Sequence, residues 1–224
     1  MGSQQGNVIE LYYDSVSPYS WIAFEVLHRY EKILPFELKL KPIFLGGVMH
    51  TTGNTPPALT CPQKGAYMLK ELPIVAKYWD VPLRIPSDFM GGAMAHGTLK
   101  AQRFLTSIQL NCPDFLEAAS RELFKRVWST DKPVHEVQNL REVAEAIGLP
   151  EAENIVKSID SSRIKELLGT RTKEVIKLGA FGAPWIVVKR PNQKDVCLFG
   201  SDRMHIIASL LGRPFPGPPV QAKI

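Results

Sequence analysis

A chain of 224 residues with 45% hydrophobic content can bury a full core, and its length fits one domain or one domain with a large insertion. Its formal net charge of +5 comes from scattered basic residues, which argues against nucleic acid and suits a small anionic ligand or an alkaline compartment. The apolar runs are too short for a membrane-spanning helix, and the first six residues lack a leader pattern, so we expect a soluble protein made in the cytosol.

The cysteines and histidines predict neither a disulfide framework nor a metal site. The three cysteines, Cys61, Cys112 and Cys197, are odd in number and far apart. No two histidines have a spacing that would place two ligands on one helix face. We therefore expect no resident metal.

The first third of the chain predicts a β-α-β unit. An apolar strand from Val8 to Tyr13 leads into a helix that starts at Pro18 and runs to about Lys32, and Phe36 to Pro42 alternate as a second strand. The stretch from Gly46 to Pro62 is rich in Gly, Thr, Pro and Asn, which predicts a long loop. Loops of that length are uncommon unless they are functional, so this one is a candidate binding loop.

The middle of the chain, from Lys64 to Gly179, predicts helices. An extended connector from Val81 to Pro86 interrupts them, because each proline disfavours helix in the residue before it. The helical pattern is found in four segments: Thr98–Leu110, Pro113–Trp128, Val137–Ile147 and Ser162–Leu178.

Strand signals return after Gly179. Two strands, Trp185–Lys189 and Val196–Phe199, precede a helix with Met204 and Ile207 on one face. These elements predict an α/β protein with a thioredoxin-like fold, interrupted by an all-helical inserted domain. Residues 1–62 and 179–224 are expected to form the thioredoxin-like domain and residues 63–178 the insertion.

Serines stand where a thioredoxin-like chain has its redox cysteines. In the segment Ser17-Pro18-Tyr19-Ser20, both positions of a Cys-Pro-Tyr-Cys pair are serine, which excludes a dithiol reaction at this place. The Ser17 hydroxyl lies at a predicted helix N-terminus, where it is placed to donate to the thiolate of a ligand. Taken alone, such a serine is more often only a helix cap.

Two further motifs fall at positions that surround the same pocket in thioredoxin folds. Pro184 directly precedes a strand, as in the cis-proline loop that faces the first helix and lets the preceding residue pair with a peptide-like ligand. After Gly200, a helix is expected to open with Ser201 and Asp202, where free N–H groups favour a carboxylate.

Together these motifs closely resemble the kappa class of glutathione transferases, over nearly the whole chain. The segments that carry the resemblance are Ser17–Trp21, Gly53–Pro57, Lys64–Met68, Gly179–Pro184 and Phe199–Met204. The resemblance implies a homodimeric enzyme that activates the thiol of glutathione, its co-substrate, as thiolate for attack on small electrophiles in detoxification. It implies no other cofactor, and peroxidase activity is a further expectation.

The resemblance also implies the site residues. Ser17 is the catalytic residue facing the sulfur, with Pro18 and Tyr19 beside it. An acidic residue that reaches across the dimer in the family falls near Glu71. The remaining glutathione contacts are Asn54 and Lys64 at the glycine end, Ala183 with Pro184 at the cysteinyl backbone, and Ser201 with Asp202 at the γ-glutamyl carboxylate.

Two other functions compete with this interpretation. Bacterial hydroxychromene-carboxylate isomerases share the fold, a Ser-Pro-Tyr segment and the use of glutathione, but usually carry an amide side chain where this chain has Ser201. A glutathione-binding adaptor or chaperone would keep Pro184 and Asp202 without needing the Ser17 hydroxyl. The third motif favours the transferase over the isomerase.

The last three residues, Ala222-Lys223-Ile224, have the small, basic, aliphatic order of the Ser-Lys-Leu peroxisomal address. We predict peroxisomal import, with mitochondrial or cytosolic residence as alternatives. The first ten residues contain no arginine and form no basic amphipathic helix, which disfavours a mitochondrial transit peptide.

Fusing residues 214–224 to a fluorescent reporter tests this address, because a receptor reads the peptide alone. We expect punctate peroxisomal fluorescence that deletion of Ile224 abolishes. Diffuse fluorescence, unchanged by the deletion, would remove the hypothesis.

Overall fold

The computed structural model describes residues 6–88 and 91–219, and its described strands form one four-stranded mixed sheet. The order is β2-β1-β3-β4, with β1 parallel to β2 and antiparallel to β3, and with β3 antiparallel to β4. The strands are β1 (Asn7–Tyr13), β2 (Phe36–Pro42), β3 (Trp185–Lys189) and β4 (Val196–Phe199). The last three agree with the predicted bounds, and β1 begins one residue earlier than predicted.

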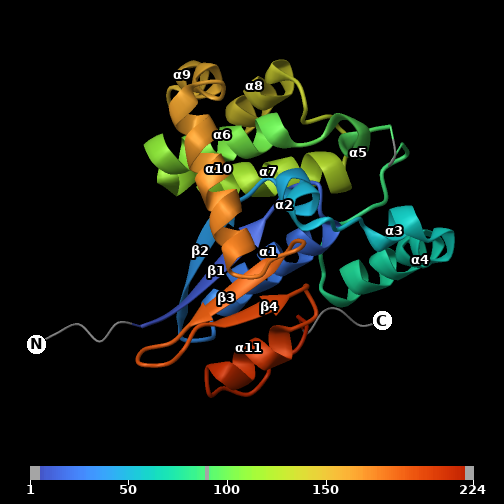
Figure 1. The fold of residues 1–224 in the computed structure, drawn as a ribbon, viewed down its shortest axis with the longest axis vertical. Coiled ribbons are helices and arrows are strands. Elements are labelled where there is room, and N and C mark those ends of the chain that lie inside the picture. Colours follow the sequence, from blue (N-terminus) through green and yellow to red (C-terminus); the bar gives the residue numbers. More distant parts are fainter. Residues whose placement is uncertain (1–5, 89–90, 220–224) are drawn as a thin grey trace, which may run out of the picture.

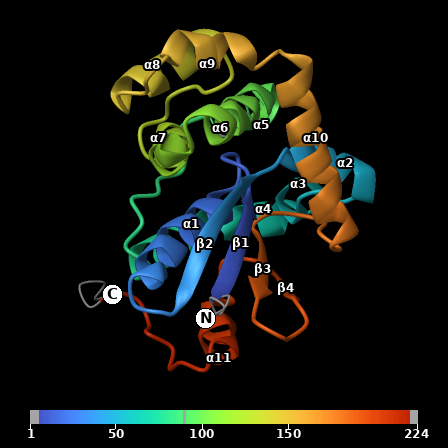
Figure 2. The same ribbon diagram turned by 90° about the vertical axis from the view of Figure 1, so that its left-hand side faces the viewer.

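Helices cover both faces of this sheet (Figure 2). On one face, Ile9 and Leu11 of β1 share a core with α1 (Pro18–Glu31) and α11 (Met204–Leu210). On the other face, Tyr12, Val187 and Trp185 pack with residues of α2 (Leu45–Thr52) and α10 (Ser162–Lys177). Successive side chains of a strand point to opposite faces, so one strand serves both cores. The chain therefore has the predicted α/β, thioredoxin-like fold.

Most of the inserted helices stack beyond one end of the sheet (Figure 1). They are α6 (Leu99–Asn111), the 3₁₀ turn η1 (Pro113–Phe115), α7 (Leu116–Trp128), α8 (Val137–Ala146) and α9 (Ala152–Ser158). Phe124 of α7 joins them to α1, with its ring 5.5 Å from that of Phe24 and 6.1 Å from that of Trp21. One hydrophobic cluster thus runs from the sheet into the insertion, and the domain boundaries at residues 62 and 179 stay a prediction.

Two helices project to one side of the molecule in Figure 1. They are α3 (Pro57–Thr60) and α4 (Pro62–Tyr78), which an extended connector joins to the short α5 (Ala93–His96). Large apolar side chains remain exposed on this pair, namely Leu59, Tyr67, Leu69 and Ile74. Among the described residues, no helix has the length and apolarity that a membrane span requires.

The prediction of a long loop from Gly46 to Pro62 was wrong. This stretch contains α2 and α3, and Gly53 ends α2 in a left-handed conformation with φ of 68°. The start of this helix has no local signal in the sequence, because the N-cap residue of α2 makes no side-chain cap bond. Its first N–H group, on Leu45, donates instead to the carboxylate of Asp14, 2.9 Å away and distant in sequence.

The helix expected to open at Ser201 begins three residues later. Ser201 and Asp202 form a turn, and α11 starts at Met204 with Arg203 as its N-cap residue. Gly200 takes φ of 98°, and a Cβ atom there would lie 2.6 Å from Asp202 Oδ1, so the turn requires glycine. The tripeptide Ala222-Lys223-Ile224 lies outside the described residues, and its role as an address stays a prediction.

The free edge of β2 is bonded by side chains from three helices. The Leu38 N–H donates to Glu31 Oε1 at 2.7 Å. Gln109 Nε2 donates to the Leu40 carbonyl oxygen at 2.9 Å, and Arg171 Nη1 donates to that of Pro42 at 3.0 Å. These bonds satisfy backbone groups that an edge strand otherwise leaves unpaired.

Candidate functional site

Ser17 caps the first helix and holds its hydroxyl in a fixed place. Its Oγ accepts a hydrogen bond from the Ser20 N–H at 3.1 Å, and its backbone is extended, as an N-cap residue requires. Pro18 follows as the first helical residue, a position where a missing N–H is harmless. The side chain is buried. The cap bond confirms the prediction that the Ser17 hydroxyl lies at the helix N-terminus.

The Ser17 hydroxyl also contacts the second motif. Its proton is donated to the carbonyl oxygen of Ala183 at 3.1 Å, a contact between residues 166 positions apart. The peptide bond between Ala183 and Pro184 is cis, as expected for this loop. A hydroxyl has one proton, so an acceptor other than Ala183 requires that this bond be released.

The third motif is tied to the second through the backbone. The Gly200 N–H donates to the Pro184 carbonyl oxygen at 3.1 Å, so the turn at Ser201 lies beside the cis-proline loop. Ser201 is buried, whereas Asp202 is exposed and forms an ion pair with Arg203. The three motifs therefore lie next to one another in the fold.

Asn54 approaches this arrangement from α2. Its Nδ2 donates to the Phe181 carbonyl oxygen at 2.7 Å, and its N–H donates to the Met49 carbonyl oxygen at 3.1 Å, which fixes it to the end of the helix. Lys64 is exposed in the first turn of α4, and its side chain forms no hydrogen bond or ion pair with the other candidate residues in the part of the chain that the structure describes. The structure thus brings Asn54 to the cis-proline loop and leaves Lys64 on the surface of the projecting pair.

A carboxylate and two phenols surround the start of α1 on the side of α4. The hydroxyl of Tyr19 donates to Glu71 Oε2 at 3.0 Å, and that of Tyr67 donates to Glu71 Oε1 at 3.3 Å. Burial raises the pKa of Tyr19, and the nearby carboxylates of Glu71 and Asp202 raise it further. The phenol therefore stays protonated near neutral pH, and Asp202 lies within electrostatic reach of it.

Asp14 lies at the end of β1, completely buried beneath this region. Its Oδ1 accepts from the Val16 N–H at 3.1 Å, from Thr98 Oγ1 at 2.6 Å and from Gln102 Nε2 at 3.0 Å. Its Oδ2 accepts from the Leu45 N–H. Burial raises the pKa of this carboxyl, and the four donors oppose that rise.

A cavity of about 250 Å³ opens next to the serine turn, on the side of the helical insertion. The residue before Ser17, Val16, lines it together with Val127 and Trp128 of α7 and with Pro86 and Pro133. The polar part of its lining consists of Ser87, Asp88, Asp131, Lys132 and His135. A small, partly apolar molecule would fit beside the serine turn.

Sequence reasoning missed Asp14 and the cavity. A single acidic residue after an apolar strand was the only local signal for Asp14, because three of its four partners lie 31 to 88 positions away. Trp128, the last residue of a predicted helix, is buried in the core, and its indole N–H donates to the Ser15 carbonyl oxygen at 3.0 Å. Within the described residues, no group of three or more His, Cys, Asp or Glu side chains could hold a metal ion.

Comparison with known proteins finds similarity along nearly the whole chain. The family model described as "DSBA-like thioredoxin domain" matches residues 8–212. The glutathione S-transferase kappa 1 of Rattus norvegicus is 43% identical over 213 residues, which cover 94% of this chain and 93% of that protein.

A second group of relatives is more distant. The 2-hydroxychromene-2-carboxylate isomerase of Sphingobium xenophagum is 23% identical over 210 residues, covering 91% of this chain and 97% of that protein. A solved structure of a 2-hydroxychromene-2-carboxylate isomerase superimposes with a TM-score of 0.76 at 19% identity, over 92% of this chain and 94% of that one. At that identity the structural likeness concerns the fold alone.

Proposed function

Because the chain belongs to the kappa class of glutathione S-transferases, we propose that the residues gathered around Ser17 bind glutathione and ionise its thiol. The enzyme is a glutathione transferase, and the roles of its individual residues are the proposal. The observation that carries these roles is the bond from Ser17 Oγ to the Ala183 carbonyl oxygen, which joins the first helix to the cis-proline loop.

Thiolate formation sets the energy that the site must supply. A free thiol has a pKa of about 8.5, and lowering it by two units requires about 2.7 kcal/mol of preference for the anion. A hydrogen bond to a charged group contributes about 1.5 to 3 kcal/mol, and a helix N-terminus about 0.3 to 1 kcal/mol. The Ser17 hydroxyl at the start of α1 combines both contributions.

Binding of the tripeptide frees the hydroxyl for this task. In the structure the proton of Ser17 points to the Ala183 carbonyl oxygen. An amide N–H from the cysteinyl residue of glutathione, pairing with that carbonyl, replaces the hydroxyl as donor. The hydroxyl then turns to the sulfur, so thiolate stabilisation and backbone pairing occur in one event.

The two ends of glutathione lie on opposite sides of this contact. At the γ-glutamyl end, the buried hydroxyl of Ser201 binds the carboxylate and the exposed Asp202 binds the ammonium group. At the glycine end, Asn54 and Lys64 bind the second carboxylate. Pro18 and Tyr19 form the floor at the start of α1, and Pro184 shapes the loop that presents Ala183.

The electrophile occupies the cavity beside Val16. Its volume of about 250 Å³ suits a small molecule, and the walls of Val127 and Trp128 suit an apolar or aromatic one. Complete ionisation of the thiol gains only about tenfold in reactive species near neutral pH. Holding the electrophile in line with the sulfur therefore supplies the larger part of the acceleration. Reduction of organic hydroperoxides is a second reaction that the same thiolate would support.

The competing functions have less support. Identity to the transferase is 43%, against 23% to the isomerase, at similar coverage. Ser201 also stands where the isomerases usually have an amide. An adaptor without turnover would leave the Ser17 hydroxyl unexplained. The absence of any cofactor besides glutathione stays a prediction.

The projecting pair α3 and α4 supports a homodimer. Leu72 and Ala76 of α4 are buried in the core, whereas Ile74 is 61% exposed and Tyr67 is 62% exposed on the projecting pair (Figure 1). Exposed apolar side chains grouped on one element favour an interface with another subunit. Glu71 lies on this element and is bonded to Tyr19 and Tyr67 of its own chain, so its reach across the dimer stays a prediction.

Replacing Ser17 by alanine should raise the pH midpoint for thiolate absorbance of bound glutathione by about 1 to 2 units, because a bond worth about 1.5 to 3 kcal/mol is lost. Affinity for glutathione should change little. Ser161→Ala is a matched control, because Ser161 caps α10 by the same bond, to the Ile164 N–H, and should lose similar stability. An unchanged midpoint in the Ser17 variant would contradict the role of the hydroxyl.

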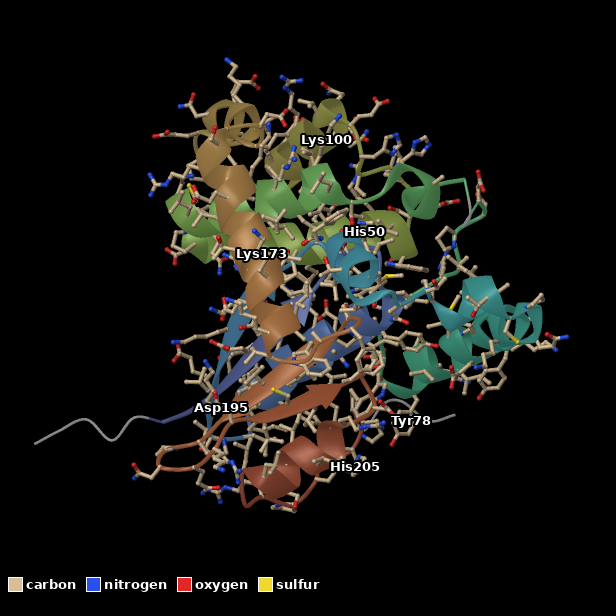
Figure 3. All side chains as sticks on the ribbon, viewed as in Figure 1. His50, Tyr78, Lys100, Lys173, Asp195 and His205 are labelled. Atoms are coloured by element: carbon tan, nitrogen blue, oxygen red, sulfur yellow. The ribbon has the colours of Figure 1, made fainter. Side chains whose placement is uncertain are left out.

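Asp202→Ala should weaken glutathione binding about tenfold, the loss expected for one charged contact of about 1.4 kcal/mol. Asp195→Ala removes the same charge from the exposed hairpin between β3 and β4, labelled in Figure 3, and should leave the affinity unchanged. Titration calorimetry measures both variants. Wild-type affinity in the Asp202 variant would place the γ-glutamyl group elsewhere.

Sedimentation at micromolar concentration should show a dimer that Ile74→Asp dissociates, because a charge would be buried in the interface. Ile33→Asp is the control, since Ile33 is 62% exposed but belongs to the turn between α1 and β2 and not to α3 or α4. A fully active monomer in the wild type is the result that rejects the dimer.

A further inference from the structure

The completely buried carboxyl group of Asp14 accepts hydrogen bonds from four uncharged donors, and without such donors a charge in a protein interior costs several kcal/mol. Gln102 of α6 supplies one of these donors, and the other three lie at or near helix N-termini. Leu45 is the first residue of α2, Thr98 is the N-cap residue of α6, and Val16 lies in the turn that leads into α1. Partial positive charge at these termini stabilises an anion.

The Val16 bond and the Ser17 backbone fix the serine turn to Asp14. The Ser17 N–H donates to the Asp14 carbonyl oxygen at 3.0 Å, while the Val16 N–H donates to the carboxylate of the same residue. Asp14 therefore bonds this turn at two points, while Trp128 and Gln102 bond it at Ser15. The position of the Ser17 hydroxyl is set by this turn.

The Leu45 bond fixes α2 to the same carboxylate. Asp14 serves here as the missing cap of α2, whose own N-cap residue Phe44 makes no side-chain bond. The other end of this eight-residue helix carries Gly53 and Asn54, and the Asn54 N–H is bonded to the last turn. A shift of the first turn is therefore transmitted to Asn54, because a hydrogen-bonded helix moves as a unit.

We propose that Asp14 is a positioning residue for glutathione binding. The Asp14 carboxylate sets the separation between the serine turn and Asn54, because one of its oxygens accepts from the Val16 N–H and the other from the Leu45 N–H. The inference rests on the roles proposed above for Ser17 and Asn54. It assigns Asp14 no contact with substrate. Loss of the bond to Leu45 should misplace the glycine-binding end relative to the sulfur.

Two variants break this bond from opposite sides. In Asp14→Asn, the amide that replaces Oδ2 turns a donor toward the Leu45 N–H, while Oδ1 can keep its three bonds. Leu45→Pro removes the donor, and the site accommodates proline because it is the first position of a helix and Phe44 before it is extended. Leu45→Ala is the matched control that shortens the same side chain and keeps the N–H.

The probe is the preference for glutathione over γ-glutamylcysteine, which lacks the glycine that Asn54 binds. Calorimetry on the full chain should show that Asp14→Asn and Leu45→Pro each reduce this preference about fivefold, as expected for one lost hydrogen bond of about 1 kcal/mol. Leu45→Ala should keep it. The double variant should lose no more than either single one, because both break the same bond. A purely structural role would lower thermal stability without changing the ratio of affinities.

Asn54→Leu separates failure of the inference from failure of the proposed site. If Asn54→Leu loses the preference and Leu45→Pro keeps it, Asp14 does not position the glycine end and the inference is overturned. If Asn54→Leu keeps the preference, Asn54 does not bind glycine, and the proposed site and the inference fall together. Should Asp14→Asn fail to fold, Leu45→Pro decides the question, since it leaves the carboxylate in place.

Discussion

The geometry of the site depends on one buried carboxyl group, that of Asp14. A carboxylate without a cation is tolerated in an interior only when donors surround it, and the four donors to Asp14 come from the serine turn, α2 and α6. Among the described residues, Oδ2 has its one donor in Leu45, so α2 cannot move away without leaving that oxygen without a hydrogen bond, whereas the serine turn and α6 share Oδ1. Breaking these hydrogen bonds would cost free energy, and this cost holds the segments that carry Ser17 and Asn54 in place.

A second constraint is that the Ser17 hydroxyl has a single proton. The bond from the Ser20 N–H orients the oxygen. The hydroxyl proton can be donated either to the Ala183 carbonyl oxygen or to a ligand, but not to both. In a dithiol enzyme of this fold, the first motif supplies the reacting sulfur itself. In the proposed function, the protein supplies only a donor and the sulfur arrives with glutathione, so the same residues would determine both the affinity for the tripeptide and its reactivity.

Local patterns predicted the strands and the long helices well, because alternation and helical periodicity are properties of short windows. The bounds of β2, β3 and β4 follow from the sequence for this reason. Helix α2 was not predictable in this way, since Gly46 and Gly47 are poor helix formers and its cap lies in Asp14, 31 positions upstream. The start of α11 was misplaced because Ser201 and Asp202 look like a cap, whereas Gly200 at φ of 98° turns them into a separate bend. The ends of a helix cannot be predicted from a short window of sequence when residues outside that window determine them.

The side-chain hydrogen bonds along the edge of β2 affect when the newly made chain is protected from aggregation. An open strand edge is a template on which other chains add strands and aggregate. On β2, Glu31, Gln109 and Arg171 occupy backbone groups that an incoming strand would need. Two of these three side chains belong to α6 and α10, which emerge from the ribosome long after β2 itself. The parallel pair β1 and β2 is therefore protected from self-association only after the helical insertion has docked, and the interval before that is when chaperone protection matters most.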